Sequence, residues 1–132
     1  MKYIYPAIFK SEPDGGYLVE FPDLPECYTD GDSLEDALYN AEDALALMMW
    51  TLEEKKAPIP EATNPADVSF PAGAIVSLVK ADTLPVRKMN DNRAVRKNVT
   101  IPGWLDTIAR ENNINFSQLL QNAIIRECGI ES

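Results

Sequence analysis

Residues 94–132 constrain the fold more than any other part of this sequence, because they hold three structural elements and too few residues to bury them. Residues 94–101 alternate with the period-2 pattern of a strand, and two stretches of helical periodicity follow. A unit of fewer than about 40 residues rarely forms a sufficient core alone. We therefore expect this segment to fold only as a dimer with a second copy of the chain.

Start and stop signals place the two helices of this segment. Pro102 is tolerated in the first turn of a helix, and Asn112 and Asn113 suit the left-handed conformation that ends one. Asn115, with Gln118 three residues later, predicts a capped second helix. The apolar positions are Trp104, Leu105, Ile108 and Ala109 in the first helix, and Leu119, Leu120, Ala123, Ile124 and Cys128 in the second.

A strand followed by two helices is the layout of the ribbon-helix-helix DNA-binding fold, in which paired strands enter the major groove. Alternation puts Arg96, Asn98 and Thr100 on one face of the strand, and these side chains can hydrogen-bond base edges. The second helix starts at residues 115–117 (Asn115, Phe116 and Ser117), whose free amides predict phosphate contacts. An ordinary edge strand explains the alternation equally well.

The N-terminal part has the pattern of a small sheet. Residues 2–9 and 17–21 are rich in aromatic and β-branched types, and the turn cluster 12–16 between them predicts a β-hairpin. Pro6 predicts an edge position or a bulge for its strand. Residues 27–29 predict a short third strand.

One long amphipathic helix follows. Asp32 or Ser33 can cap it, with Glu35 or Asp36 three residues on. Its apolar stripe consists of Leu34, Leu38, Ala41, Leu45, Met48 and Leu52. The apolar run 74–79 then predicts a fourth strand. The fold class we expect is α+β: a β-β-β-α-β domain over residues 1–79, a polar linker over 80–93, and the ribbon-helix-helix unit over 94–132.

The net charge of the chain also differs between residues 1–79 and the residues that follow. Residues 1–79 hold 4 basic and 15 acidic side chains, a net charge of −11, whereas residues 80–132 hold 8 basic and 6 acidic ones, a net charge of +2. An acidic body with a more basic tail is typical of a chain with two tasks. The chain has no signal-peptide pattern and no apolar run of about 18 residues. We expect a cytoplasmic protein without a membrane partner.

Nucleophilic catalysis that depends on an imidazole base is excluded, because the sequence contains no histidine. Cys27 and Cys128 lie too far apart for a zinc motif and are expected to be small buried residues. The carboxylates of residues 12–43 are best explained by turns and by a solvated helix face. We therefore expect no metal and no cofactor.

Ordered motifs in this chain resemble those of the HicB-type antitoxins. They are Tyr5-Pro6-Ala7, Asp14-Gly15-Gly16-Tyr17, Phe21-Pro22-Asp23-Leu24-Pro25, Gly31-Asp32-Ser33-Leu34-Glu35-Asp36-Ala37, Asn40-Ala41, Ile59-Pro60, Arg96-Lys97-Asn98-Val99-Thr100-Ile101-Pro102 and Asn115-Phe116-Ser117-Gln118. Glu26 departs from the family pattern, which usually has glycine before the cysteine. The resemblance implies a partial RNase H-like N-terminal domain without nuclease chemistry, followed by the ribbon-helix-helix variant of the C-terminal domain.

The function that the resemblance implies is that of a bacterial type II antitoxin. Such a protein neutralises a HicA-type ribonuclease toxin and represses its own operon by binding operator DNA. We expect the toxin to bind residues 1–79, with Tyr17, Phe21, Leu24 and Tyr28 as candidate anchors. Two alternatives stay open: a divalent-metal RNase H-like nuclease that uses Asp23 and the helix acids, and a stand-alone repressor that senses a small ligand. The homodimer can also pair into a tetramer.

Overall fold

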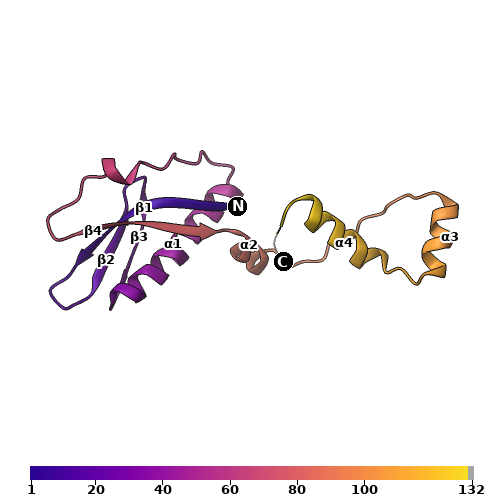
Figure 1. The fold of residues 1–132 in the computed structure, drawn as a ribbon, viewed down its shortest axis with the longest axis horizontal. Helices are drawn as coiled ribbons and strands as arrows, with labels where there is room; N and C mark the ends of the chain where they lie inside the picture. Colours follow the sequence, from indigo (N-terminus) through magenta and orange to yellow (C-terminus); the bar gives the residue numbers. More distant parts are fainter. Residues whose placement is uncertain (131–132) are drawn as a thin grey trace. The chain divides into compact units, whose positions relative to one another are not determined.

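Two separate units make up the chain, Met1–Arg93 (the N-terminal unit) and Ala94–Ser132 (the C-terminal unit), in a computed structural model that describes residues 1–130. The end of the expected C-terminal domain, residues 131–132, lies outside the described residues. The helices and strands of both units are labelled in Figure 1. Each unit has its own architecture.

A four-stranded antiparallel sheet forms the N-terminal unit, in the order β3-β2-β1-β4. Its strands are β1 (Lys2–Ser11), β2 (Tyr17–Phe21), β3 (Leu24–Gly31) and β4 (Ile75–Asp82). The expected hairpin is confirmed, because β1 pairs with β2 from Ile8 opposite Glu20 to Ser11 opposite Tyr17.

The edge position or bulge expected from Pro6 is wrong, because β1 is an inner strand and pairs with β4 from Lys2 to Phe9 without a register shift. The register explains why proline is tolerated. Pairing with β2 begins only at Ile8, so Pro6 has a paired neighbour in β4 alone, opposite Leu78. Proline, which has no N–H, can be accommodated where one side of the strand makes no backbone hydrogen bonds to a neighbouring strand.

The helix α1 (Leu34–Glu54) covers one face of this sheet, and Ser33 caps it by accepting a 3.1 Å hydrogen bond from the amide of Asp36. The helix is confirmed, but its buried residues are Ala37, Ala41, Leu45 and Met49. The larger Leu34 and Leu38 are exposed instead. The rest of the expected stripe faces the sheet, because Ala41 and Leu45 are buried and Met48 and Leu52 pack against the core.

At Gly31 the chain passes very close to the backbone of the first turn of α1. A Cβ atom at position 31 would lie 2.3 Å from the backbone nitrogen of Ala37 and 2.6 Å from its Cα. Because those atoms are backbone, no side-chain rotation could relieve the contact. The end of β3 and the start of α1 can approach this closely only because residue 31 has no side chain.

The core of the N-terminal unit lies between the sheet and α1. It comprises Tyr5, Ala7, Phe9, Val19, Phe21, Leu24, Cys27, Ala37, Ala41, Leu45, Met49, Val79 and Ala81. Burial of Cys27 raises the pKa of its thiol to about 11, so Cys27 is a neutral small apolar residue at physiological pH.

Residues 80–93 are not a structureless linker. Strand β4 continues to Asp82, the helix α2 (Leu84–Asn90) follows, and the buried Thr83 lies between them. A short 3-10 turn, η1 (Pro65–Asp67), interrupts the long connection before β4. The N-terminal unit therefore needs residues beyond 79 to complete its structure.

The C-terminal unit contains the two expected helices, α3 (Gly103–Glu111) and α4 (Phe116–Glu127). Asn113 has the expected left-handed backbone (φ 55°), and the side chain of Asn115 accepts a 3.1 Å hydrogen bond from the amide of Gln118. Residues 91–102 form no strand in this single chain. No residue from 94 to 130 is buried.

Candidate interaction surfaces

The residues expected to read DNA bases are all exposed. Arg96, Asn98 and Thr100 lie in the segment before α3, and none of their side chains forms a hydrogen bond or ion pair within residues 1–130 of the structure. Their side chains are therefore available to an external hydrogen-bonding partner. Lys97, which lies between two of them in the sequence, is exposed as well.

A groove in the C-terminal unit brings part of this set together. It has a volume of about 490 Å³, and its lining residues are Ala94, Val95, Arg96, Lys97, Ser117, Leu120, Gln121 and Ile124. Arg96 and Ser117, expected to contact a base and a phosphate, thus lie along one groove. Asn98 and Thr100 are not part of its lining. The side chain of Asn115 is occupied by its capping bond, which leaves only its backbone for a phosphate.

Large apolar side chains remain uncovered throughout the C-terminal unit. Those that are exposed are Val95, Val99, Ile101, Trp104, Leu105, Ile108, Ile114, Phe116, Leu119, Leu120, Ile124 and Ile130. Such an extent of exposed apolar surface marks an interaction site in a soluble protein.

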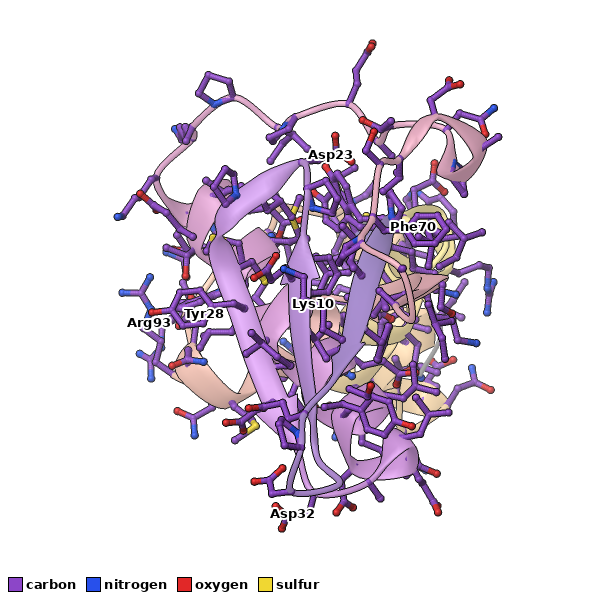
Figure 2. All side chains as sticks on the ribbon, turned by 90° about the vertical axis from the view of Figure 1, so that its left-hand side faces the viewer. Lys10, Asp23, Tyr28, Asp32, Phe70 and Arg93 are labelled. Carbon is purple, nitrogen blue, oxygen red and sulfur yellow. The ribbon has the colours of Figure 1, made fainter. Side chains whose placement is uncertain are left out.

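Two of the four expected toxin anchors belong to the core. Phe21 is 2% exposed and Leu24 is 5% exposed, so neither side chain is accessible to a partner. Tyr17 is half-buried against the same core. Tyr28 is 68% exposed and lines a hollow of about 390 Å³, and Figure 2 shows it with Lys10 on the sheet.

Asp23, the residue named for the nuclease alternative, has a structural role. Its two carboxylate oxygens accept hydrogen bonds from the backbone N–H of Thr63 at 2.9 Å and from the Thr63 hydroxyl at 2.5 Å. These hydrogen bonds join the β2–β3 turn to the connection between α1 and β4. Asp23 is labelled in Figure 2. Within residues 1–130, no three Cys, Asp or Glu side chains lie together as a metal site.

The carboxylate of Glu53 joins α1 to β1, to α2 and to Thr83, which lies between β4 and α2. It accepts hydrogen bonds from the hydroxyls of Tyr3 (2.7 Å) and Thr83 (2.9 Å) and from the guanidinium of Arg87 (2.7 Å). Burial alone raises the pKa of this carboxyl, but the hydrogen bonds from Tyr3 and Thr83 and the nearby N-terminal ammonium give a net lowering. Burial and the bond to Glu53 raise the pKa of Tyr3 to about 12. This network holds α2 on the end of α1.

The outward side of α1 was missed by the sequence analysis. Tyr39 and Leu47 are 58% and 54% exposed, and the exposed Asp43 lies midway between them. Their spacing of four residues is a detectable signal, because residues four apart share one face of a helix. The sequence analysis considered only the apolar stripe on the opposite side of the helix.

Comparisons with known proteins agree on one family. The model described as HicB_like antitoxin of bacterial toxin-antitoxin system matches residues 5–124. Antitoxin HicB 2 of Photorhabdus laumondii is 28% identical over 122 residues, which cover 91% of this chain and 87% of that protein. Antitoxin HicB 1 of the same organism is 39% identical over 69 residues, which cover 51% of this chain and 44% of that protein, less than half its length.

Solved structures show the same likeness, one of them over nearly the full length of the chain. A toxin–antitoxin complex from Streptococcus pneumoniae contains a chain that is 26% identical, with a TM-score of 0.61, and the match covers 96% of this chain and 99% of that one. In the HicA3 and HicB3 toxin–antitoxin complex, a chain that is 28% identical matches with a TM-score of 0.51 over 61% of this chain and 99% of its own.

No helix among the described residues is long and apolar enough to cross a membrane. The fold is α+β, and the family model spans both units, from β1 through most of α4. By this match, the chain belongs to the HicB-like antitoxin family of bacterial toxin–antitoxin systems.

Proposed function

We propose that this protein is an antitoxin with two binding activities. Its N-terminal unit, which we assign to the partial RNase H-like class, binds and neutralises a HicA-type ribonuclease toxin. Its C-terminal unit forms a homodimeric ribbon-helix-helix domain that binds operator DNA and represses the protein's own operon. The observation that carries this proposal is that one unit has a complete core and the other, from 94 to 130, has no buried residue.

Dimerisation supports the DNA-binding half of the proposal. Two copies of residues 94–101 paired as antiparallel strands would satisfy their backbone groups and cover the apolar sides of α3 and α4. Arg96, Asn98 and Thr100 would then lie on the outer face of a two-stranded ribbon, a shape that the major groove admits. A two-fold dimer requires a pseudo-palindromic operator.

Charge supports the toxin-binding half. Residues 1–79 carry a net charge of −11. A small protein that cleaves RNA must hold phosphates and is therefore basic. Opposite charges accelerate association and disfavour other partners. Both proposed partners place the protein in the cytoplasm.

The proposal describes a binding protein and not an enzyme. Asp23 was the acidic residue on which the nuclease alternative depended, and both of its oxygens are used by Thr63. A metal-dependent nuclease needs carboxylates that converge on a cation. We therefore prefer the antitoxin function to the nuclease.

Two assays on the full-length protein test this proposal. The DNA immediately upstream of its reading frame is titrated in a gel-shift assay with wild type, an Arg96→Ala/Asn98→Ala double variant and an Arg110→Ala control. Arg110 is an exposed arginine on α3, paired with Asp106. We expect wild type and control to bind, and the double variant to bind at least about tenfold more weakly.

The second assay co-expresses the protein with the product of a neighbouring short basic reading frame. We expect that product to arrest growth alone and growth to recover with the antitoxin. Absence of both operator binding and growth rescue would contradict the proposed function. Rescue by the Arg96→Ala/Asn98→Ala variant would show that the two activities are separable.

A further inference from the structure

The side of α1 that faces away from the sheet carries an exposed row of residues. Asp36, Tyr39, Asp43, Leu47 and Glu54, which we name the outer row, are all exposed. At about 100° per residue they lie opposite the buried Ala37, Ala41, Leu45 and Met49. The outer row therefore belongs to the side of α1 that no strand covers.

This face of the helix is strongly acidic. The 21 residues of α1 include six acidic side chains and no basic one. Within residues 1–130, Glu53 is the member of this set that forms ion pairs, whereas none is found for Asp36, Asp43 or Glu54. The three carboxylates of the outer row thus leave their charge uncompensated at the surface.

Two large apolar side chains lie among these charges. Tyr39 and Leu47 are each more than half exposed. Aromatic and aliphatic anchors supply most of the affinity of protein interfaces, while surrounding charges affect mainly association rate and specificity. The combination of anchors and unpaired acids on one helix is the pattern of a docking surface.

We propose that the outer row of α1 is the surface on which the antitoxin binds its toxin, a small basic protein. This inference rests on the proposed function and specifies where the partner binds. Charge excludes the other occupants. A second copy would bring two outer rows with three carboxylates each into contact, and DNA would meet the same carboxylates with its phosphates.

The uncovered face of the sheet is the competing surface. Ile4, Tyr28 and Leu78 are exposed there, and Figure 2 shows Tyr28 and Lys10 on this part of the sheet. Its charged residues are of both signs: Lys10 pairs with Glu20 at 2.9 Å, and the exposed Lys80 and Asp30 alternate onto the same face. A basic partner therefore finds less charge complementarity on the sheet than on α1.

The test compares these two faces in the full-length protein. The partner used as probe is the purified basic protein from the neighbouring reading frame, and affinity is measured by titration calorimetry. The variant is Tyr39→Ala/Leu47→Ala, and the matched control is Ile4→Ala/Leu78→Ala, which also removes two large apolar side chains that are more than half exposed. Thermal unfolding and operator binding check that both variants keep their fold.

We expect the outer-row variant to bind the toxin at least about tenfold more weakly than wild type, and the control variant to bind within about twofold. An Asp36→Asn/Asp43→Asn variant should associate more slowly at low salt, and the difference should shrink as salt rises. This charge variant reports on docking even if removal of the two apolar side chains alters stability.

The outcomes separate this inference from the function on which it rests. Loss of binding in the control variant with normal binding in the outer-row variant would overturn the inference and leave the antitoxin function intact. A wild-type protein that fails to bind the toxin at all would overturn the function and, with it, the inference.

Discussion

The two units of this chain use the same kinds of residue with opposite results. In the N-terminal unit, Phe9, Phe21, Leu45 and Met49 are almost completely buried between α1 and the sheet. In the C-terminal unit, large apolar side chains are as frequent along the helices as in α1, yet from 94 to 130 none is buried. Amphipathic helices alone do not make a stable unit, because stability comes mainly from what the apolar face packs against. The C-terminal unit therefore depends on association.

The largest expected effect comes from where the chain is cut. A fragment of residues 1–93 should fold as a monomer, whereas a fragment of residues 1–79 should not. The shorter fragment ends inside β4 and removes the buried Ala81 and Thr83 together with Arg87, a partner of Glu53. Circular dichroism and thermal unfolding of both fragments measure this. A cooperative transition in the 1–79 fragment would show that β4 and α2 are dispensable.

The next effect concerns the dimer. Leu120→Asp should abolish dimerisation and operator binding at micromolar concentration, because a carboxylate would be buried in the new interface at a cost of about 3 kcal/mol or more. Asn122→Asp adds the same charge on the polar side of α4, where Asn122 accepts a bond from Gln118, and should keep the dimer.

Sedimentation of wild type and both variants at several protein concentrations measures how much of each protein is dimeric. Wild type should show a stability of the C-terminal unit that rises with concentration, while unfolding of the N-terminal unit should not depend on it. A wild-type protein that stays monomeric and fully folded at low concentration would remove the contrast between the two units.

A smaller effect is confined to the N-terminal unit and depends on pH. Glu53→Gln should lower the free energy of unfolding by about 2 kcal/mol at neutral pH, the usual contribution of hydrogen bonds to a charged group. The pKa of Glu53 is lowered in the folded state. Its stabilisation is therefore complete above the unfolded pKa of about 4.3 and is lost as pH falls through the lower folded pKa.

Denaturant titrations of both proteins between neutral and acid pH measure this difference. The gap between wild type and Glu53→Gln should be constant above about pH 5 and close in more acidic solution. A gap that grew on acidification would contradict the direction assigned to this pKa.

The smallest effect compares the two helix caps, whose hydrogen bonds are both 3.1 Å long. Ser33→Ala and Asn115→Ala should each cost about 1 kcal/mol. The first should lower the concentration-independent unfolding transition, and the second should weaken dimerisation. If both variants changed the same transition, the two units would be energetically coupled.

Local sequence signals predicted most of the fold correctly. The hairpin followed from the glycine-rich turn, and α1 from the serine cap. The helix α2 was missed because its reason for forming is tertiary: Arg87 contacts Glu53, 34 residues earlier in the chain. The inner position of β1 was missed because the register with β2, not Pro6 itself, decides whether proline is tolerated.

The candidate sites were predicted less evenly. Arg96, Asn98 and Thr100 are exposed, but so are the alternate residues Lys97 and Val99, so the assignment of this face to DNA stays a prediction. Alternation alone could not say which face of β2 lies under α1, so Phe21 was taken for a surface anchor although it is part of the core. The ribbon itself stays a prediction, because strand pairing between two chains is not a property of one.

Gly31 has a consequence for how this protein can evolve. A side chain at position 31 would collide with backbone atoms in the first turn of α1. Any residue other than glycine there must therefore displace the strand or the helix. In a library of random variants selected for a working antitoxin, position 31 should return glycine alone, while the exposed neighbours Asp30 and Asp32 should vary. The position of α1, the helix that we assign to toxin binding, would then be preserved by glycine at position 31, which is not itself part of the proposed binding surface.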